Sequence, residues 1–429
     1  VMVTGYDIIF FWVARMIMAG LEFTNKIPFR DVYITGMIKD DLGRWMSKSL
    51  GNGIDPEDMI NQYGSDAVRF TMISLASEGQ DIKLATSRFE SGRNFANKLW
   101  NSYRFLMSQV DQLSLSPKPN KKIAVTNESA LMDRWIISRL TTAVSAIYAS
   151  ASRYHVNDII NVIYDFFWKD YCDWYLEFAK TAVNGAENEQ EKSDTIGRAV
   201  EIFSTVIKLL HPSMPFITED IWQGIKPYLH ESSITQPNSE FHSDVENSEI
   251  NFPSIVQQAY PLADDFRNDE NAENEMNIVQ SIIGAVRKIR SEMKVPPSKK
   301  ADLYVSRATP ESQAVILDNN PNIKRLAGLS EVVFSSERPA NSAASVVGEM
   351  EVFLPLKGLI DLEVEEKRLS KEIARLKALI AGSKKKLSNS KFVENAPEKV
   401  IEHERSKLED CGAQMEKFQN NLKAISKAI

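Results

Sequence analysis

The C-terminal segment, residues 357–429, carries a heptad repeat, and no other pattern in the chain restricts the fold so strongly. Apolar residues recur at alternating steps of four and three, resume after a polar interruption at 389–397, and continue to the last residue. Such spacing lines one seam of a helix, which must pack against a second helix. We therefore expect an antiparallel hairpin of two helices, each about 45 Å long for about 30 residues. The seam positions are Leu362, Leu369, Ile373, Leu376, Ile380 and Leu387, then Leu408, Cys411, Met415, Phe418, Leu422, Ile425 and Ile429.

Residues 1–88 predict alternating strands and helices. A short β-rich run at 31–35 ends at a glycine and a polar loop. A helix is expected at 56–63, because Asp55 is a favourable N-cap and Pro56 suits the first helical turn. Residues 1–4 resemble a buried strand, so we expect a further portion of the same domain upstream of Val1.

Two more regions lie before the repeat, and both differ in pattern from the first. Residues 89–270 predict long helices joined by polar loops, which favours a helix bundle. Residues 271–356 predict a small α/β module. The chain should therefore be multidomain, with α/β and all-α parts. Helices are expected at 131–150, 157–183, 193–210, after Pro215 and at 277–293, a loose loop at 231–250, and strands at 301–306, 331–334 and 351–354.

Composition excludes several classes of protein. Cys172 and Cys411 are the two cysteines, too few for a disulfide framework or a thiolate zinc site, which favours a reducing, cytoplasmic compartment. No apolar run approaches the ~18 residues of a membrane span. The net charge of −7 argues against indiscriminate coating of nucleic acid. Residues 356–429 nevertheless carry 16 Lys and Arg against 12 Asp and Glu, so the positive charge lies at the C-terminus.

A polar loop at residues 43–52 carries the sharpest chemical signal. It contains the hydroxyls of Ser47 and Ser49, the ammonium of Lys48 and two glycines. Hydroxyls and an ammonium are oriented donors for a polyphosphate, and glycines let the backbone approach a ligand closely. On composition alone, an ordinary surface loop is the alternative interpretation.

A second constellation follows the first strand. Gly5 and Asp7 form a turn that leads into a very apolar segment. The apolar segment predicts a buried core helix, and we expect Phe10, Phe11 and Met16 to belong to that core.

The loop at residues 45–49 resembles the second signature of the class I aminoacyl-tRNA synthetases, Lys-Met-Ser-Lys-Ser, at four of five positions. The resemblance implies that Lys48 contacts the phosphates of ATP, bound with Mg²⁺, and stabilises charge on the leaving pyrophosphate. Ser47 and Ser49 would shape the loop. Trp45 stands where the family usually has lysine, and an indole supplies no cation, which puts ATP binding or loop closure in doubt. Arg44 is the neighbouring candidate to compensate.

The turn after the first strand also resembles this family, in which a Gly-x-Asp turn lies against the adenosine of the aminoacyl-adenylate. The resemblance implies that Gly5 permits close approach, and that Asp7 accepts a hydrogen bond from a ribose hydroxyl or caps the helix. Trp12 resembles the tryptophan that walls the amino-acid pocket, with simple core packing as the alternative.

Residues 8–11, Ile-Ile-Phe-Phe, are similar to the valine-specific members, whereas isoleucine-specific members usually have Gln-His-Arg-Gly there. The coiled-coil ending fits bacterial valine-specific members, and no cysteine-rich zinc segment is present, so no structural zinc is expected. The resemblance implies four parts: the C-terminal half of a Rossmann-like catalytic core at 1–88, an anticodon-binding helix bundle at 89–270, a small α/β module at 271–356, and a coiled-coil tRNA-binding arm at 357–429.

Several matched residues also have a structural interpretation. Asp66 and Arg69 are three apart and can pair along one helix face, which would brace it. Aromatics at 164–175 can stack on anticodon bases, although we expect Phe167 and Trp174 to be core residues. His211 is interpreted as a structural histidine.

The interruption in the heptad repeat resembles the tip of the valine-specific arm. Four lysines cluster beside it, and on a projecting hairpin they can contact tRNA phosphates in a salt-dependent manner. A solvated charged surface is the alternative interpretation. These residues are Lys384, Lys385, Lys386 and Lys391.

The family's first signature, His-Ile-Gly-His, does not occur in these 429 residues, and the editing domain normally lies upstream as well. The resemblance implies a cytoplasmic, monomeric ligase that activates valine with ATP and transfers it to valine tRNA, with no membrane partner. The present chain alone should be inactive. Two alternatives remain open: a non-catalytic tRNA-binding relative, with Trp45 as a sign of decay, or an isoleucine- or leucine-specific enzyme.

Overall fold

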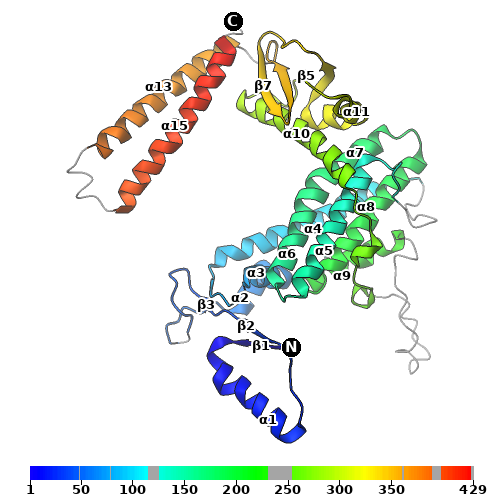
Figure 1. The fold of residues 1–429 in the computed structure, drawn as a ribbon, viewed down its shortest axis with the longest axis vertical. Helices are drawn as coiled ribbons and strands as arrows, with labels where there is room; N and C mark the ends of the chain where they lie inside the picture. Colours follow the sequence, from blue (N-terminus) through cyan, green and yellow to red (C-terminus); the bar gives the residue numbers. More distant parts are fainter. Residues whose placement is uncertain are drawn as a thin grey trace. The chain divides into compact units, whose positions relative to one another are not determined.

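The computed structural model divides the chain into two compact units, Val1–Glu273 and Asn274–Ile429 (Figure 1). It combines all-α and α/β parts, as the sequence predicts. Helices in the described part of the chain are too short or too polar to cross a bilayer. The predicted loop at 231–250 lies outside the described residues, which are 1–47, 49–77, 79–114, 125–229, 254–359, 362–388 and 398–426.

The first unit begins with two parallel strand pairs, each joined by a helical crossover as parallel pairing requires. β1 (Met2–Gly5) pairs with β2 (Val32–Thr35), and β3 (Ile38–Lys39) pairs with β4 (Ile82–Lys83). The first crossover holds a 3-10 turn (Tyr6–Ile8), a π-helical turn (Ile9–Val13) and α1 (Ala14–Thr24); the second holds α2 (Pro56–Tyr63) and α3 (Ser65–Leu75).

The N-terminal helical segment is not the buried core that its composition predicts. Phe10 is 78% exposed and Phe11 62%, and Met16 is half-buried. The strand at 2–5 is confirmed, but Val3 is 62% exposed. Among the described strands, β1 pairs with β2 alone. The prediction that Phe10 and Phe11 are core residues is therefore wrong for this chain.

The rest of the first unit is a helix bundle whose helices occur where the periodicity predicts them (Figure 1). Phe167 is fully buried, as predicted, and Trp174 is half-buried and stacks on Phe178. The predicted helix at 157–183 is one continuous helical run interrupted by a π-helical segment. The elements are α4 (Phe89–Val110), α5 (Leu131–Ala151), α6 (Val156–Asp165), the π-helical segment (Phe166–Tyr175), α7 (Leu176–Gly185), α8 (Glu189–Leu210) and α9 (Pro215–Ile225), with 3-10 turns at Thr86–Arg88, Lys226–Tyr228, Ile255–Gln257 and Ala263–Asp265.

The second unit contains a four-stranded sheet of order β6-β5-β8-β7. β5 and β6 are parallel and the other two pairs are antiparallel. The sequence does not predict β7, whose Ser-Ala-Ala-Ser-Val-Val run has few of the large β-branched and aromatic residues typical of strands. The elements are α10 (Glu270–Glu292), β5 (Ala301–Ser306), α11 (Pro310–Asp318), α12 (Asn320–Ala327), β6 (Leu329–Phe334), β7 (Ser342–Val347) and β8 (Met350–Pro355).

The heptad segment folds as the predicted hairpin of α13 (Leu362–Leu387) and α15 (Glu398–Ser426), which lie side by side (Figure 1). Ile373 and Leu376 are buried in the seam. Ser383 donates a hydrogen bond to the buried Glu404 at 2.8 Å, so the end of α13 faces the start of α15. A buried polar contact of this kind fixes the register of a coiled coil. The side chains of Leu362, Leu369 and Ile425, and all of Ile429, lie outside the described residues.

Candidate functional site

Asp40 braces the polar loop that follows β3. Its carboxylate accepts hydrogen bonds from the Arg44 backbone N–H at 2.8 Å, the Arg44 Nε at 2.8 Å and the Asn52 Nδ2 at 2.9 Å. The Asn52 hydrogen bond, followed by those from Arg44, holds the pKa of Asp40 at about 2. Arg44 is therefore neutralised by Asp40, which argues against its expected role as a substitute cation.

Asn52 closes the loop from its other end. Its Oδ1 accepts from the Ser47 backbone N–H at 3.0 Å, and its Nδ2 donates to the Trp45 carbonyl at 3.1 Å. The hydroxyls of Ser47 and Ser49 lie 3.1 Å apart. This arrangement fits the expectation that the two serines shape the loop. Lys48 lies outside the described residues, so its role stays a prediction.

The Trp45 ring already contacts a cation, the ammonium of Lys39. The Lys39 ammonium lies 4.1 Å from the centroid of the Trp45 ring, a cation–π contact, and 2.9 Å from the Asp81 carboxylate. Asp81 also accepts from the Met37 backbone N–H at 3.0 Å. Hydrogen bonding with Lys39, followed by that from Met37, lowers the pKa of Asp81.

Asp81 also connects the loop to the N-terminal turn. Burial, followed by the charge of Asp81, raises the pKa of Tyr6. Next to Tyr6, a Cβ added to Gly5 would lie 2.7 Å from Asp7 Oδ1 and 3.3 Å from Met37 Sδ, so a side chain there would clash. The structure therefore brings the turn at Gly5 and Asp7 together with the base of the loop, through Met37, which lies against Gly5 and binds Asp81. Sequence reasoning missed this link.

Trp12 lies on the π-helical turn and is 55% exposed, whereas Val13 beside it is buried. Its side chain is thus accessible to a ligand and is not packed in a core. The expected role of Trp12 as a wall of the amino-acid pocket stays a prediction.

Asp66 and Arg69 connect α3 to the bundle. Asp66 accepts from the Ile217 backbone N–H at 2.7 Å, at the first turn of α9. Arg69 donates to the carbonyls of Ser213 at 3.0 Å and Pro212 at 3.1 Å. The expectation that the two residues brace α3 by pairing with each other is wrong, because each binds the backbone just before or at the start of α9.

His211 lies in the same connection. Its Nδ1 is 2.8 Å from the Thr218 hydroxyl, and burial lowers its pKa. This satisfied ring nitrogen supports the interpretation of His211 as a structural histidine.

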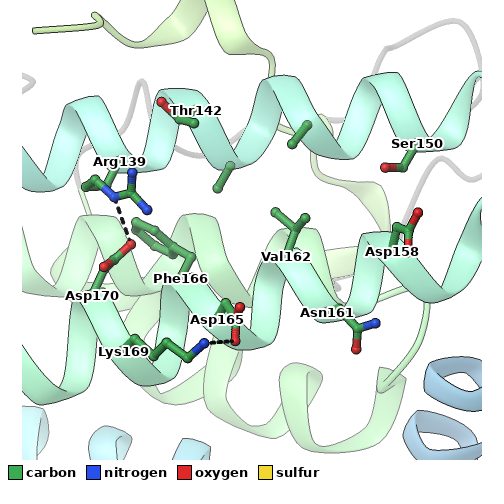
Figure 2. Close-up of a pocket in the computed structure, with 12 residues that line it drawn as sticks. Arg139, Thr142, Ser150, Asp158, Asn161, Val162, Asp165, Phe166, Lys169 and Asp170 are labelled. Atoms are coloured by element: carbon green, nitrogen blue, oxygen red, sulfur yellow. Dashed lines mark hydrogen bonds and ion pairs between the residues drawn. The ribbon is translucent and has the colours of Figure 1, made fainter. Parts of the chain in front are cut away.

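A groove of about 610 Å³ lies on the bundle between α5 and the run formed by α6 and the π-helical segment (Figure 2). Arg139 pairs with Asp170 at 3.0 Å, and Lys169 pairs with Asp165 at 2.9 Å. Burial raises the pKa of Asp170. With Asp158, three carboxylates line the groove against two cations, so it suits the polar edge of an uncharged group better than a phosphate. Sequence reasoning missed the groove, because its charges are spaced along helices that otherwise look like an ordinary bundle.

The arm lysines differ in their surroundings. Lys384 and Lys385 are exposed, whereas Lys386 pairs with Glu404 at 2.6 Å. Lys391 lies outside the described residues. The structure therefore leaves Lys384 and Lys385 as the two cations of the predicted set that have no ion-pair partner in the described part of the arm.

Three family models match the chain in order. Residues 1–85 match tRNA synthetases class I (I, L, M and V), residues 133–305 match the anticodon-binding domain of tRNA ligase, and residues 361–426 match the valyl tRNA synthetase tRNA binding arm.

Curated relatives match nearly the whole chain. The valine–tRNA ligase of Chlorobaculum tepidum is 38% identical over 99% of this chain, that of Geobacillus kaustophilus 38% over 96%, and that of Bacillus subtilis 37% over 98%. The chain spans 45%, 44% and 45% of these relatives, respectively, which is less than half of their length. Among solved structures, the LeuRS-tRNA-LeuAMS complex of Agrobacterium radiobacter K84 is 15% identical with a TM-score of 0.42, over 77% of this chain and 36% of that one.

Proposed function

The chain belongs to the valine–tRNA ligases of the class I tRNA synthetases, as a C-terminal portion, and from this premise we propose that the complete polypeptide activates valine with ATP and transfers it to valine tRNA. Valine, ATP and valine tRNA are its proposed substrates, and a cytoplasmic monomer is its proposed state.

The observation that carries the proposal is the connection between the N-terminal turn and the polar loop. Met37 lies against Gly5, and its backbone N–H donates to Asp81. Asp81 in turn pairs with Lys39, whose ammonium lies over the Trp45 ring. A nucleotide bound with its adenosine at the Gly5 turn would therefore have its phosphates within reach of the loop. Preorganised donors at such a position stabilise charge that develops on a leaving group.

The residues present fit ATP. The exposed hydroxyl of Ser49 lies beside that of Ser47, so the loop presents two hydroxyls that can donate to a phosphate. Mg²⁺ usually keeps several waters and is held by substrate phosphates with one or two carboxylates. We expect it to arrive with the nucleotide. Its contribution would be to neutralise phosphate charge.

We also propose roles for the four parts of the chain. Residues 1–88 would complete the catalytic core, 89–270 would bind the anticodon stem and loop, 271–356 would form a connecting module, and 357–429 would form the tRNA-binding arm. The groove on the bundle would accept an unstacked nucleobase, because its polar lining suits base edges.

The present chain should not activate valine by itself, because the first class I signature does not occur in it. The test is therefore made on the complete polypeptide. Valine-dependent ATP–pyrophosphate exchange is expected to exceed exchange with isoleucine by about 100-fold, the discrimination that one methylene allows in an apolar pocket. Aminoacylation of valine tRNA is measured alongside.

The same experiment separates the alternatives. Exchange with isoleucine or leucine above that with valine would favour another branch of the family, which residues 8–11 and the curated relatives do not favour. Binding of valine tRNA without exchange for any amino acid would favour the non-catalytic alternative.

For the arm, replacing Lys384 and Lys385 with Gln should weaken the binding of valine tRNA by about tenfold at low salt and flatten its salt dependence, because each phosphate contact releases counterions. Filter binding at several salt concentrations measures both. The matched control is Lys371→Gln with Lys377→Gln, two exposed lysines farther from the tip on the same helix. Equal effects of the two double variants would contradict a contact at the tip.

A further inference from the structure

β3 and β4 place two lysines side by side. Lys39 and Lys83 are register partners in this parallel pair, so both side chains lie on the same face of the two strands. On the other side of Lys39, Trp45 forms an antiparallel β-bridge with Lys39, so the Trp45 side chain lies on the same face. Like charges on neighbouring strands destabilise each other unless an anion lies between them.

Asp81 neutralises one of these two lysines. Its carboxylate lies 2.9 Å from the Lys39 ammonium, which also stacks on Trp45. Arg44, the other cation of this region, is paired with Asp40 at 2.8 Å. Within the described residues Lys83 has neither an ion-pair nor a hydrogen-bond partner, and its side chain is exposed.

Lys83 is held near the start of the polar loop. A Cβ added to Gly43 would lie 3.4 Å from Lys83 Cε and 3.7 Å from its Nζ. Gly43 has φ of +79°, a conformation that favours glycine, so the stem of Lys83 lies over the bare backbone of this turn. The ammonium therefore projects beside the segment that leads to the hydroxyls of Ser47 and Ser49.

We propose that Lys83 binds a phosphate group of ATP and is a second phosphate-contacting cation of the loop, in addition to Lys48. The inference rests on the proposed function and extends it to a residue outside the signature string. The bound phosphate provides the anion that Lys83 lacks, since Asp81 already neutralises Lys39. Lys83 in turn supplies a cation on the same face as Trp45, whose indole carries no charge.

The test compares Lys83→Met with Lys83→Arg in the complete polypeptide. Lys83→Met should raise the KM for ATP about tenfold or more in valine-dependent ATP–pyrophosphate exchange, since a charge-assisted hydrogen bond is lost. The KM for valine should stay unchanged, and Lys83→Arg should stay within about threefold of wild type. Lys300→Met, at an exposed lysine of the second unit, controls for loss of one charge.

Calorimetric titration with ATP and thermal melting are measured on the same proteins. A KM for ATP and an ATP affinity within twofold of wild type in Lys83→Met would overturn the inference. Wild-type protein without exchange would contradict the proposed function instead, and weaker ATP binding by Lys83→Met would then still support the phosphate contact. If Lys83→Met melts at a lower temperature than wild type, the ATP affinity of Lys83→Arg decides. If the side chain only packs against the turn, ATP affinity should not depend on the charge at position 83. Trp45→Lys in the Lys83→Met background should restore part of the ATP affinity.

Discussion

Replacing Lys48 with alanine in the complete polypeptide is expected to lower the rate of valine-dependent ATP–pyrophosphate exchange by about 100- to 1,000-fold, the usual effect of removing one preorganised donor to a developing charge. The loop that carries Lys48 is held at both ends, by Asp40 on one side and Asn52 on the other. An ammonium on a braced loop needs little reorganisation when the pyrophosphate leaves, so most of its effect should appear in kcat.

Two companion measurements make this result specific. Lys48→Arg keeps the charge with a different shape, so its activity should fall between wild type and Lys48→Ala. The KM for valine should not change, because the amino-acid pocket is predicted at Trp12 and not at the loop. Exchange by Lys48→Ala within fivefold of wild type would remove the loop from the chemistry, and with it the enzymatic proposal.

Elements specified by local pattern could be predicted from the sequence. α2 begins where Asp55 and Pro56 predict it, and the Asp55 side chain accepts from the Glu57 backbone N–H at 2.9 Å. The hairpin of α13 and α15 follows from its heptads. In each case the signal lies within a few turns of chain, so no knowledge of distant contacts is needed.

Features that depend on distant segments could not be predicted. Asp81 contacts Met37 from 44 positions away, and Arg69 contacts Ser213 from 144 away. Their partners are backbone groups, which leave no mark in the pattern of side chains. The interpretation of Phe10 as a core residue failed for the opposite reason, since the apolar pattern of residues 8–14 predicts burial, whereas Phe10 is exposed in the structure.

The roles of Gly5, Asp7, Trp12 and Lys48 remain predictions from resemblance. The structure adds a physical context for two of them, because Asp7 and Met37 both lie against Gly5, and the Met37 backbone N–H donates to Asp81. That context also shows which residues the signature string omits. Asp40 and Asn52 organise the loop, and Asp40 precedes the signature at residues 45–49.

Asp40→Ala should therefore lower kcat for valine-dependent exchange by about 100-fold, since misplacing catalytic groups by about 1 Å can cost that much. The change leaves the Arg44 guanidinium and the Asn52 amide without their shared acceptor, and Asn52 then loses its hold on the Ser47 backbone. Asp40 itself is buried, but most of the loop around it is exposed, so the melting temperature should change by only a few degrees.

The neighbouring Asp41 provides the matched control, because it is exposed and its replacement with alanine removes the same charge from the same turn. Exchange by Asp41→Ala should stay within about threefold of wild type. Asn52→Ala should reproduce most of the loss in Asp40→Ala, and the double variant should lose little more, since residues that act as one network are not additive. Equal losses in Asp40→Ala and Asp41→Ala would mean that the negative charge of the turn matters and the bracing does not. Additive losses in the double variant would mean that Asp40 and Asn52 act separately, and the loop would then have to be held by contacts other than the Asp40–Asn52 hydrogen bond.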